Sequence, residues 1–179
     1  MEDERTLYCI MGPSGSGKST LEKNIKNEFP WLKSVESYTT RPPRYKNEPG
    51  HLFVTKEEFD KFKLVAYTLF NGYEYGVTEE LLDKADLYVI DLEGLKVLKE
   101  RYNRPMVIIG LTIDKDICKS RMLARGEPIE LVEARIHNDI KMFEGYEKYC
   151  NVIIDANGDE NSVLAQFIDK VAEFKNNLR

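Results

Sequence analysis

The stretch "GPSGSGKST" (residues 12–20) decides the fold, because it lies between an apolar segment, "TLYCIM" (6–11), and a helical pattern, "KSTLEKNIKNE" (18–28). It satisfies the pattern GxxxxGK[ST] with the strand before it and the helix after it that this pattern requires. The glycines let successive backbone N–H groups turn toward one anion, and the start of the helix adds a favourable partial charge. We therefore predict a phosphate-binding P-loop that binds ATP through Gly12, Pro13, Ser14, Gly15, Ser16, Gly17, Lys18, Ser19 and Thr20.

Three polar side chains are candidates for phosphoryl chemistry. Lys18 would reach the β- and γ-phosphates of ATP, and the Ser19 hydroxyl would ligate Mg²⁺. Asp91 ends the apolar segment "LYVID" (87–91), so its carboxylate should emerge at the carboxyl edge of a parallel sheet, where ligands of open α/β folds bind. We predict that Asp91 acts beside Mg²⁺ or the phosphoryl acceptor, with helix capping as the alternative.

Short apolar segments alternate with amphipathic ones along most of the chain. The segments typical of buried parallel strands are 6–11, 87–91, 106–113 and 151–155. Helical patterns follow them at 18–28, at 93–102, from an Asp114 cap toward Arg125, and at 163–174. Strands that alternate with helices predict a doubly wound, three-layer α/β fold with a parallel sheet.

Two regions interrupt this alternation. Residues 34–85 are rich in Tyr, Pro and charge, contain a capping box from Thr55 to Glu58, and predict a small insertion of strands with a helix or two. Residues 119–145 predict a helix, a break at "GEP" (126–128) and a second helix through Arg135, which together could form a mobile lid.

Both interrupting regions carry arginines, whose planar fork pairs phosphate oxygens two at a time. Phosphoryl transfer needs positive charge around the transferring group and exclusion of water more than it needs covalent chemistry. Besides Lys18, we predict that positive charge comes from Arg41, Arg44, Arg121, Arg125 and Arg135.

Composition bounds the class of protein. The chain has 179 residues, of which 42% are hydrophobic, so it can bury one core and is too short for two ordinary domains. A net charge of −5 argues against a protein that coats nucleic acid or an anionic membrane. Its three widely spaced cysteines fit a reducing cytosol. We expect a cytoplasmic monomer or homodimer that acts on small molecules and binds neither nucleic acid nor membrane.

The motifs "GPSGSGKST", "SYTTRPPR" (37–44), "NGYEYG" (71–76) and "RMLARG" (121–126), followed by a helix with Arg135, resemble the guanylate kinases in order and approximate spacing. The resemblance runs over nearly the whole chain. It implies a single domain over 1–179, with a P-loop core (1–33, 86–118 and 146–179), a nucleoside-monophosphate-binding insertion (34–85) and a lid (119–145).

The resemblance also implies an activity and a set of site residues. The reaction would be transfer of the γ-phosphate of ATP to GMP or dGMP, with Mg²⁺, giving ADP and GDP or dGDP. The transferring group would be surrounded by Lys18, Arg121, Arg125 and Arg135. The acceptor's phosphate would be held by Ser37, Arg41, Arg44 and Tyr75, with His51 where the family usually has a tyrosine.

The sequence departs from the family pattern where the guanine base is read. Ala66 stands at the position of the family's glutamate, and Val77 at that of its Ser/Thr hydroxyl. Either a neighbour such as Thr68, Glu74 or Thr78 compensates, or the preferred acceptor is another one. Two alternatives therefore stay open: a related kinase of another nucleoside monophosphate or of ribose 1,5-bisphosphate, and a noncatalytic module that binds phosphopeptides.

Overall fold

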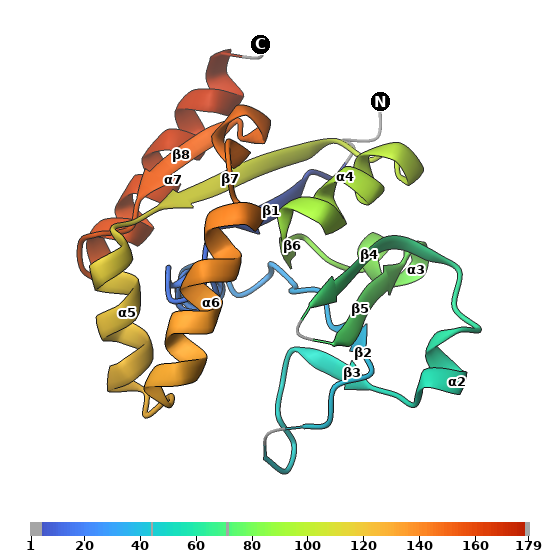
Figure 1. The fold of residues 1–179 in the computed structure, drawn as a ribbon. Coiled ribbons are helices and arrows are strands. Elements are labelled where there is room, and N and C mark those ends of the chain that lie inside the picture. Colours follow the sequence, from blue (N-terminus) through green and yellow to red (C-terminus); the bar gives the residue numbers. More distant parts are fainter. Residues whose placement is uncertain (1–4, 44, 71, 178–179) are drawn as a thin grey trace.

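The P-loop joins strand β1 (Leu7–Met11) to helix α1 (Lys18–Glu28) in the computed structural model, which describes residues 5–43, 45–70 and 72–177 (Figure 1). Within these residues β1 belongs to a parallel sheet with the strand order β6 (Leu87–Val89), β1, β7 (Met106–Thr112), β8 (Val152–Asp155). The predicted parallel sheet is confirmed, and each strand lies within two residues of its expected bounds.

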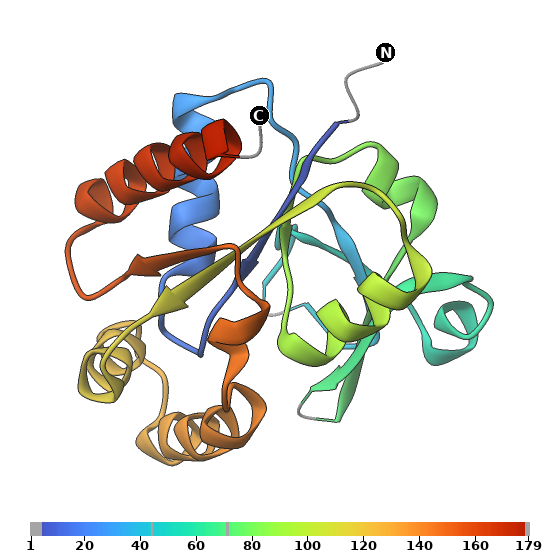
Figure 2. The same cartoon turned by 90° about the horizontal axis from the view of Figure 1, so that it is seen from above.

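Helices cover both faces of this sheet and make the expected three layers. Figure 2 shows α1 and the C-terminal helix α7 (Glu160–Asn177) together on one face, and α4 (Leu92–Arg101) on the other. The alternation of side chains along β1 explains why two faces must be covered. Ile10 packs with the α1 and α7 residues, whereas Cys9 packs with the α4 residues, and both side chains are fully buried.

A second sheet lies beside the first, within the region that interrupts the α/β alternation. Its strand order is β3 (His51–Phe53), β2 (Ser37–Thr39), β5 (Tyr73–Thr78), β4 (Leu64–Phe70). The helices of this region are α2 (Lys56–Phe59) and α3 (Glu79–Asp83). The expected capping box is confirmed: the Thr55 side chain accepts from the Glu58 amide, and the Glu58 carboxylate accepts from the Thr55 amide.

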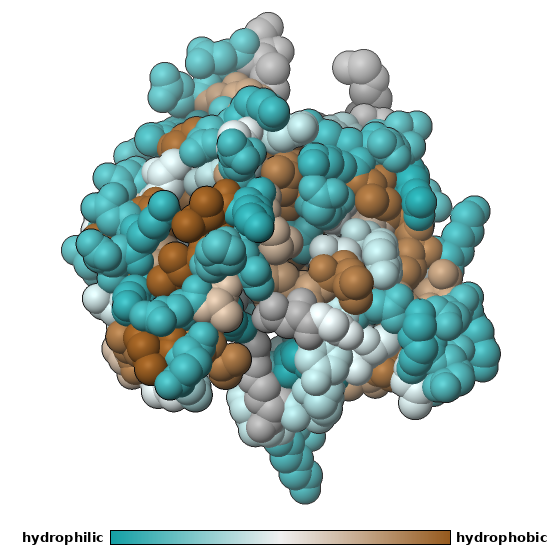
Figure 3. Space-filling view, in the orientation of Figure 1, coloured by the Kyte–Doolittle hydropathy of each residue, from teal (hydrophilic) through white to brown (hydrophobic). Residues whose placement is uncertain are grey.

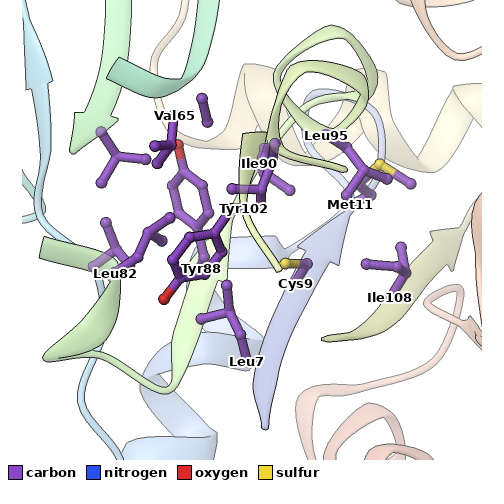
Figure 4. Close-up of a cluster of buried hydrophobic side chains, with 14 of the residues drawn as sticks. Leu7, Cys9, Met11, Val65, Leu82, Tyr88, Ile90, Leu95, Tyr102 and Ile108 are labelled. Atoms are coloured by element: carbon purple, nitrogen blue, oxygen red, sulfur yellow. The ribbon is translucent and has the colours of Figure 1, made fainter. Parts of the chain in front are cut away.

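One continuous apolar cluster joins the two sheets. Figure 4 shows Val65, from β4, near Tyr88 and Ile90, while Leu7 and Cys9 extend the cluster along β1. Burial of apolar surface is the main favourable term in packing one element on another. The second sheet is therefore packed against β6 and α4.

A helical hairpin completes the fold. Helix α5 (Lys115–Ala124) is followed by a turn at Gly126, whose φ of +82° suits glycine, and α6 (Ile129–Met142) runs back toward the sheet. A 3₁₀ turn, η1 (Tyr146–Tyr149), leads on to β8. Helix α6 is longer than expected, since it continues past Arg135 to Met142.

The end of the hairpin farthest from the sheet carries apolar side chains on its surface. Figure 3 shows them as brown atoms over α5 and α6, and Leu123, Ile129 and Leu131 are among the exposed residues there. Asp114 is the N-cap residue of α5, as expected, but its carboxylate makes no capping hydrogen bond. No helix among the described residues is long and apolar enough to cross a membrane.

Candidate active site

The P-loop is shaped by glycines that no other residue could replace. Gly15 has a φ of +76°, and a Cβ there would lie 2.8 Å from the carbonyl oxygen of Cys118 on α5. Gly17 has a φ of +93° and is the N-cap residue of α1. These positions need left-handed backbone, which L side chains adopt only with strain. The loop is thus a narrow turn that leads directly into the first turn of α1.

Lys18 folds back over this loop. Its ammonium group donates to the carbonyl oxygens of Gly12, at 2.7 Å, and Pro13, at 2.9 Å. Burial lowers the pKa of Lys18 to about 8, and the nearby carboxylates of Asp139 and Asp91 oppose that shift. The lysine is therefore a partly desolvated cation held over the loop, suited to hold a phosphate oxygen.

A carboxylate from the hairpin already contacts the loop. The Ser14 amide donates to Oδ2 of Asp139, on α6, at 2.6 Å, and Asp139 is 7% exposed. Asp139 was not among the residues predicted from the sequence. The signal that could have found it is spacing, because Asp139 follows Arg135 by four residues and so lies on the same face of a helix.

The donor cavity, as we call the hollow between the P-loop and the hairpin, brings several predicted residues together. Ser14, Gly15, Gly17, Lys18, Ser19 and Thr20 line one side, and Arg125 and Arg135 line the other. Glu127 binds both arginines, at 3.2 Å from Arg125 and 2.7 Å from Arg135. Like Asp139, Glu127 was not among the residues predicted from the sequence.

Arg121 lies on the other side of the P-loop. Its guanidinium donates to the carbonyl oxygen of Gly158 at 3.0 Å and approaches that of Ser16 at 3.5 Å. It lines a separate hollow with Gly15, Gly17 and Arg125, and it is not among the described residues of the donor cavity. The predicted joint action of Arg121 with Lys18 thus needs the Arg121 side chain to leave these carbonyl oxygens.

The acceptor cavity, of about 240 Å³, lies between the P-loop and the second sheet. Ser37, His51, Tyr75 and Asp91, all predicted to bind the acceptor, line it. Ser37 Oγ and His51 Nδ1 are 2.9 Å apart and hydrogen-bonded, and these residues are direct partners of β2 and β3. The cavity also includes Gly12, Ser14, Lys18 and Asp139, so it meets the donor cavity at Ser14 and Lys18.

Arg41 is bound by a carboxylate. Its guanidinium makes two hydrogen bonds to Glu48, at 2.7 and 3.2 Å, and one to the Pro42 carbonyl oxygen. Arg41 is not among the described residues that line the acceptor cavity. Arg44, the other arginine predicted to hold the acceptor, lies outside the described residues.

Ala66 and Val77 face one another across β4 and β5 and are fully buried. Neither is among the described residues that line the acceptor cavity. Of the three neighbours considered as substitutes, Thr68 lines the cavity. Glu74 instead binds Lys56 and Tyr67, and Thr78 is the N-cap residue of α3. Thr68 is thus the neighbour whose side chain is placed to contact an acceptor.

Asp91 combines a capping role with a place in the cavity. Its Oδ1 accepts from the Gly94 amide at 2.7 Å, which caps α4. Burial raises the pKa of Asp91, while the bonds from Gly94 and from the Thr68 side chain oppose the shift. The capping alternative is therefore confirmed, and the carboxylate still borders the cavity.

Three features define a P-loop kinase with a separate acceptor site. The P-loop lies at the carboxyl end of a parallel strand, the acceptor cavity meets the donor cavity at Lys18, and the helical hairpin places Arg125 and Arg135 opposite the loop. A model of the guanylate kinase family matches residues 4–171. The chain therefore belongs to the guanylate kinase family, whose members are ATP-dependent phosphotransferases.

Individual relatives agree with this assignment. The chain is 29% identical to a guanylate kinase of Helicobacter pylori over 95% of its own length and 89% of that protein. It is 33% identical to a guanylate kinase of Fusobacterium nucleatum over 83% of its length and 87% of that protein.

Two solved structures share the fold. Guanylate kinase from Anaplasma phagocytophilum superposes with a TM-score of 0.65 at 18% identity, covering 96% of this chain and 87% of that one. A gluconokinase from Sinorhizobium meliloti 1021 gives 0.55 at 16% identity, covering 98% and 96%. Because kinases named for different acceptors share this fold, the fold alone does not identify the acceptor.

Proposed function

We propose that this protein transfers the γ-phosphate of ATP to GMP or dGMP, giving ADP and GDP or dGDP. The observation that carries the proposal is the meeting of two cavities at Ser14 and Lys18. Phosphoryl transfer requires donor and acceptor to approach in line at one point. Lys18 lies at that point, with the P-loop on one side and the second sheet on the other.

On the donor side, the P-loop amides and Lys18 would hold the β- and γ-phosphates of ATP. Arg125 and Arg135 would exchange the Glu127 carboxylate for phosphate oxygens, since both anions suit the guanidinium fork. Arg121 would join them as the hairpin closes. Closure would also exclude water, which strengthens each of these interactions.

The side chains present fit a magnesium ion bound with ATP. Ser19 is exposed in the donor cavity at the first turn of α1, and Mg²⁺ usually takes few protein oxygens beside substrate phosphates and water. No group of three His, Cys, Asp or Glu side chains among the described residues could form a metal cage of its own. The ion, when bound, would supply charge neutralisation between the phosphates. Asp91 is the second candidate ligand, although its place in the acceptor cavity favours an acceptor contact.

On the acceptor side, Ser37, His51 and Tyr75 would hold the phosphate of GMP, with Arg41 and Arg44 adding charge. Guanine offers N–H donors on one edge, and Asp91 and Thr68 supply oxygen acceptors within the same cavity. Arg41 would release the Glu48 carboxylate and bind the acceptor's phosphate in its place.

The proposal includes the division of the chain into a core, an acceptor-binding insertion (34–85) and a lid (119–145). Its partners would be nucleotides, with the protein acting as a monomer or homodimer in the cytoplasm. The apolar pair of Ala66 and Val77 favours one second candidate, a kinase of the same kind with another phosphorylated acceptor, such as another nucleoside monophosphate or ribose 1,5-bisphosphate.

A coupled ADP-release assay with ATP and Mg²⁺ would separate these acceptors. We expect GMP or dGMP to give a kcat/KM at least about tenfold above that of AMP, CMP, UMP, dTMP and ribose 1,5-bisphosphate. Hydrogen bonds to a preferred base raise kcat/KM by that factor or more. Lys18→Ala is the matched control and should abolish turnover of every acceptor. A higher kcat/KM for another acceptor would replace GMP and leave the kinase chemistry in place. If ATP binds and nothing is phosphorylated, the protein is a binding module.

A further inference from the structure

The contact between Asp139 and the P-loop has no role in the transfer described above. A carboxylate oxygen accepts hydrogen bonds much as a phosphate oxygen does, and the start of a helix attracts either anion. The Ser14 amide donates to Asp139 at 2.6 Å, a short distance for such a bond. The carboxylate thus holds a loop amide that an incoming phosphate would use.

The position of Asp139 brings its carboxylate close to any phosphate bound at the P-loop. Asp139 is almost fully buried on α6 and borders the acceptor cavity together with Ser14 and Lys18. A triphosphate at the P-loop would lie next to this carboxylate, where two negative charges in a partly desolvated site repel one another strongly. Either the carboxylate moves away or the nucleotide binds weakly.

Helix α6 carries both this contact and Arg135, one of the arginines of the lid. Arg135 precedes Asp139 by about one helical turn and lies on the same face. Movement of α6 that releases Asp139 from Ser14 would therefore also move Arg135. The nucleotide's charge attracts the arginine and repels the carboxylate, so both effects favour the same rearrangement.

We propose that Asp139 is an anionic latch, which occupies the P-loop through the Ser14 amide in the empty enzyme, competes with the phosphates of ATP, and ties nucleotide binding to the position of the lid. The inference rests on the proposed binding of ATP at the P-loop and adds a residue that sets its affinity.

The test is the affinity for ATP in the absence of any acceptor, measured by titration calorimetry. Asp139→Asn keeps the shape and removes the charge, and the dissociation constant for ATP should fall by about tenfold, in line with the loss of one charge-assisted hydrogen bond. Asp139→Ala should tighten ATP binding at least as much. The matched control is Glu130→Gln, which removes one negative charge from an exposed position of the same helix and should change the affinity by less than about twofold. Measurement at about pH 6.5, below the Lys18 pKa of about 8, keeps that lysine charged.

Thermal unfolding distinguishes a latch from a purely structural contact. Without nucleotide, Asp139→Asn should melt below the Glu130→Gln control, whereas at saturating ATP the two should melt together. An ATP affinity that is unchanged or weaker in both Asp139 variants would overturn the proposal, even where they melt early.

A measurement on the wild-type protein needs no variant. The Ser14 amide proton, hydrogen-bonded to a carboxylate, should shift when ATP binds, and an unshifted resonance would also overturn the proposal. Because GMP turnover enters none of these measurements, failure of the latch leaves the proposed function standing. Tighter ATP binding would stand even if GMP were not the acceptor.

Discussion

Replacement of Lys18 by methionine should make the empty protein more stable and unable to bind ATP. The pKa of Lys18 falls from 10.5 to about 8, chiefly because burial disfavours the charged form. At about 1.4 kcal/mol per pKa unit, keeping that charge in the folded protein at pH 7 costs about 3 kcal/mol. Loss of the hydrogen bonds to Gly12 and Pro13 offsets part of the gain. The net increase in the free energy of unfolding should be about 1 to 2 kcal/mol.

Urea denaturation at neutral pH measures this difference, with Lys23→Met, an exposed lysine of the same helix, as the control. The dependence on pH provides a second readout. Between pH 8 and 10.5 the unfolded chain holds a proton on Lys18 that the folded protein has lost, so wild-type stability rises across this window relative to the variant. A Lys18→Met protein that is less stable than wild type at pH 7, or a difference that does not narrow by about pH 10, would refute the reasoning.

Three other substitutions test the acceptor side and the packing. Arg41→Lys lacks the planar fork that binds Glu48 here and that would bind two oxygens of the acceptor's phosphate, so it should raise the acceptor KM by about tenfold with little change in kcat, as steady-state kinetics would show. Gly110→Ala would bring a Cβ within 2.6 Å of the Cys150 sulfur and should cost about 1 to 3 kcal/mol in urea denaturation. A second change, Cys150→Ala, should restore part of that loss, and additive losses would exclude this clash. Ala66→Glu would bury a carboxylate in the apolar cluster and should cost at least about 3 kcal/mol; a neutral effect on the melting temperature would show that the side chain reaches solvent.

The parallel sheet and the P-loop could be predicted because their signals are local. Short apolar segments define β1 and β7, and the GxxxxGK[ST] pattern fixes the turn between β1 and α1. Ser37 and His51 were predicted to bind the acceptor through the family resemblance, and the structure places them in one cavity. Physical chemistry alone would not have paired them, because they are 14 residues apart and meet only through the pairing of β2 with β3.

Asp91 was predicted from its place at a strand end, but three other carboxylates of the site were not. Glu48, Glu127 and Asp139 are ordinary charged residues in a chain that has 31 Asp and Glu residues. They are distinguished by their tertiary contacts, because each binds a group expected to hold phosphate. Glu48 binds Arg41, Glu127 binds Arg125 and Arg135, and Asp139 binds the Ser14 amide. Such pairing depends on where elements distant in sequence meet, and the spacing of Asp139 from Arg135 places the two on one helix face without showing what that face contacts.

The central claim is transfer of a phosphoryl group from ATP to GMP, and product identification tests it most directly. The purified protein would be incubated with ATP, GMP and Mg²⁺, and the nucleotides separated by chromatography. We predict that ADP and GDP form in equal amounts as ATP and GMP disappear, and that Lys18→Ala forms neither. ADP that accumulates without GDP while GMP stays unchanged would contradict the claim.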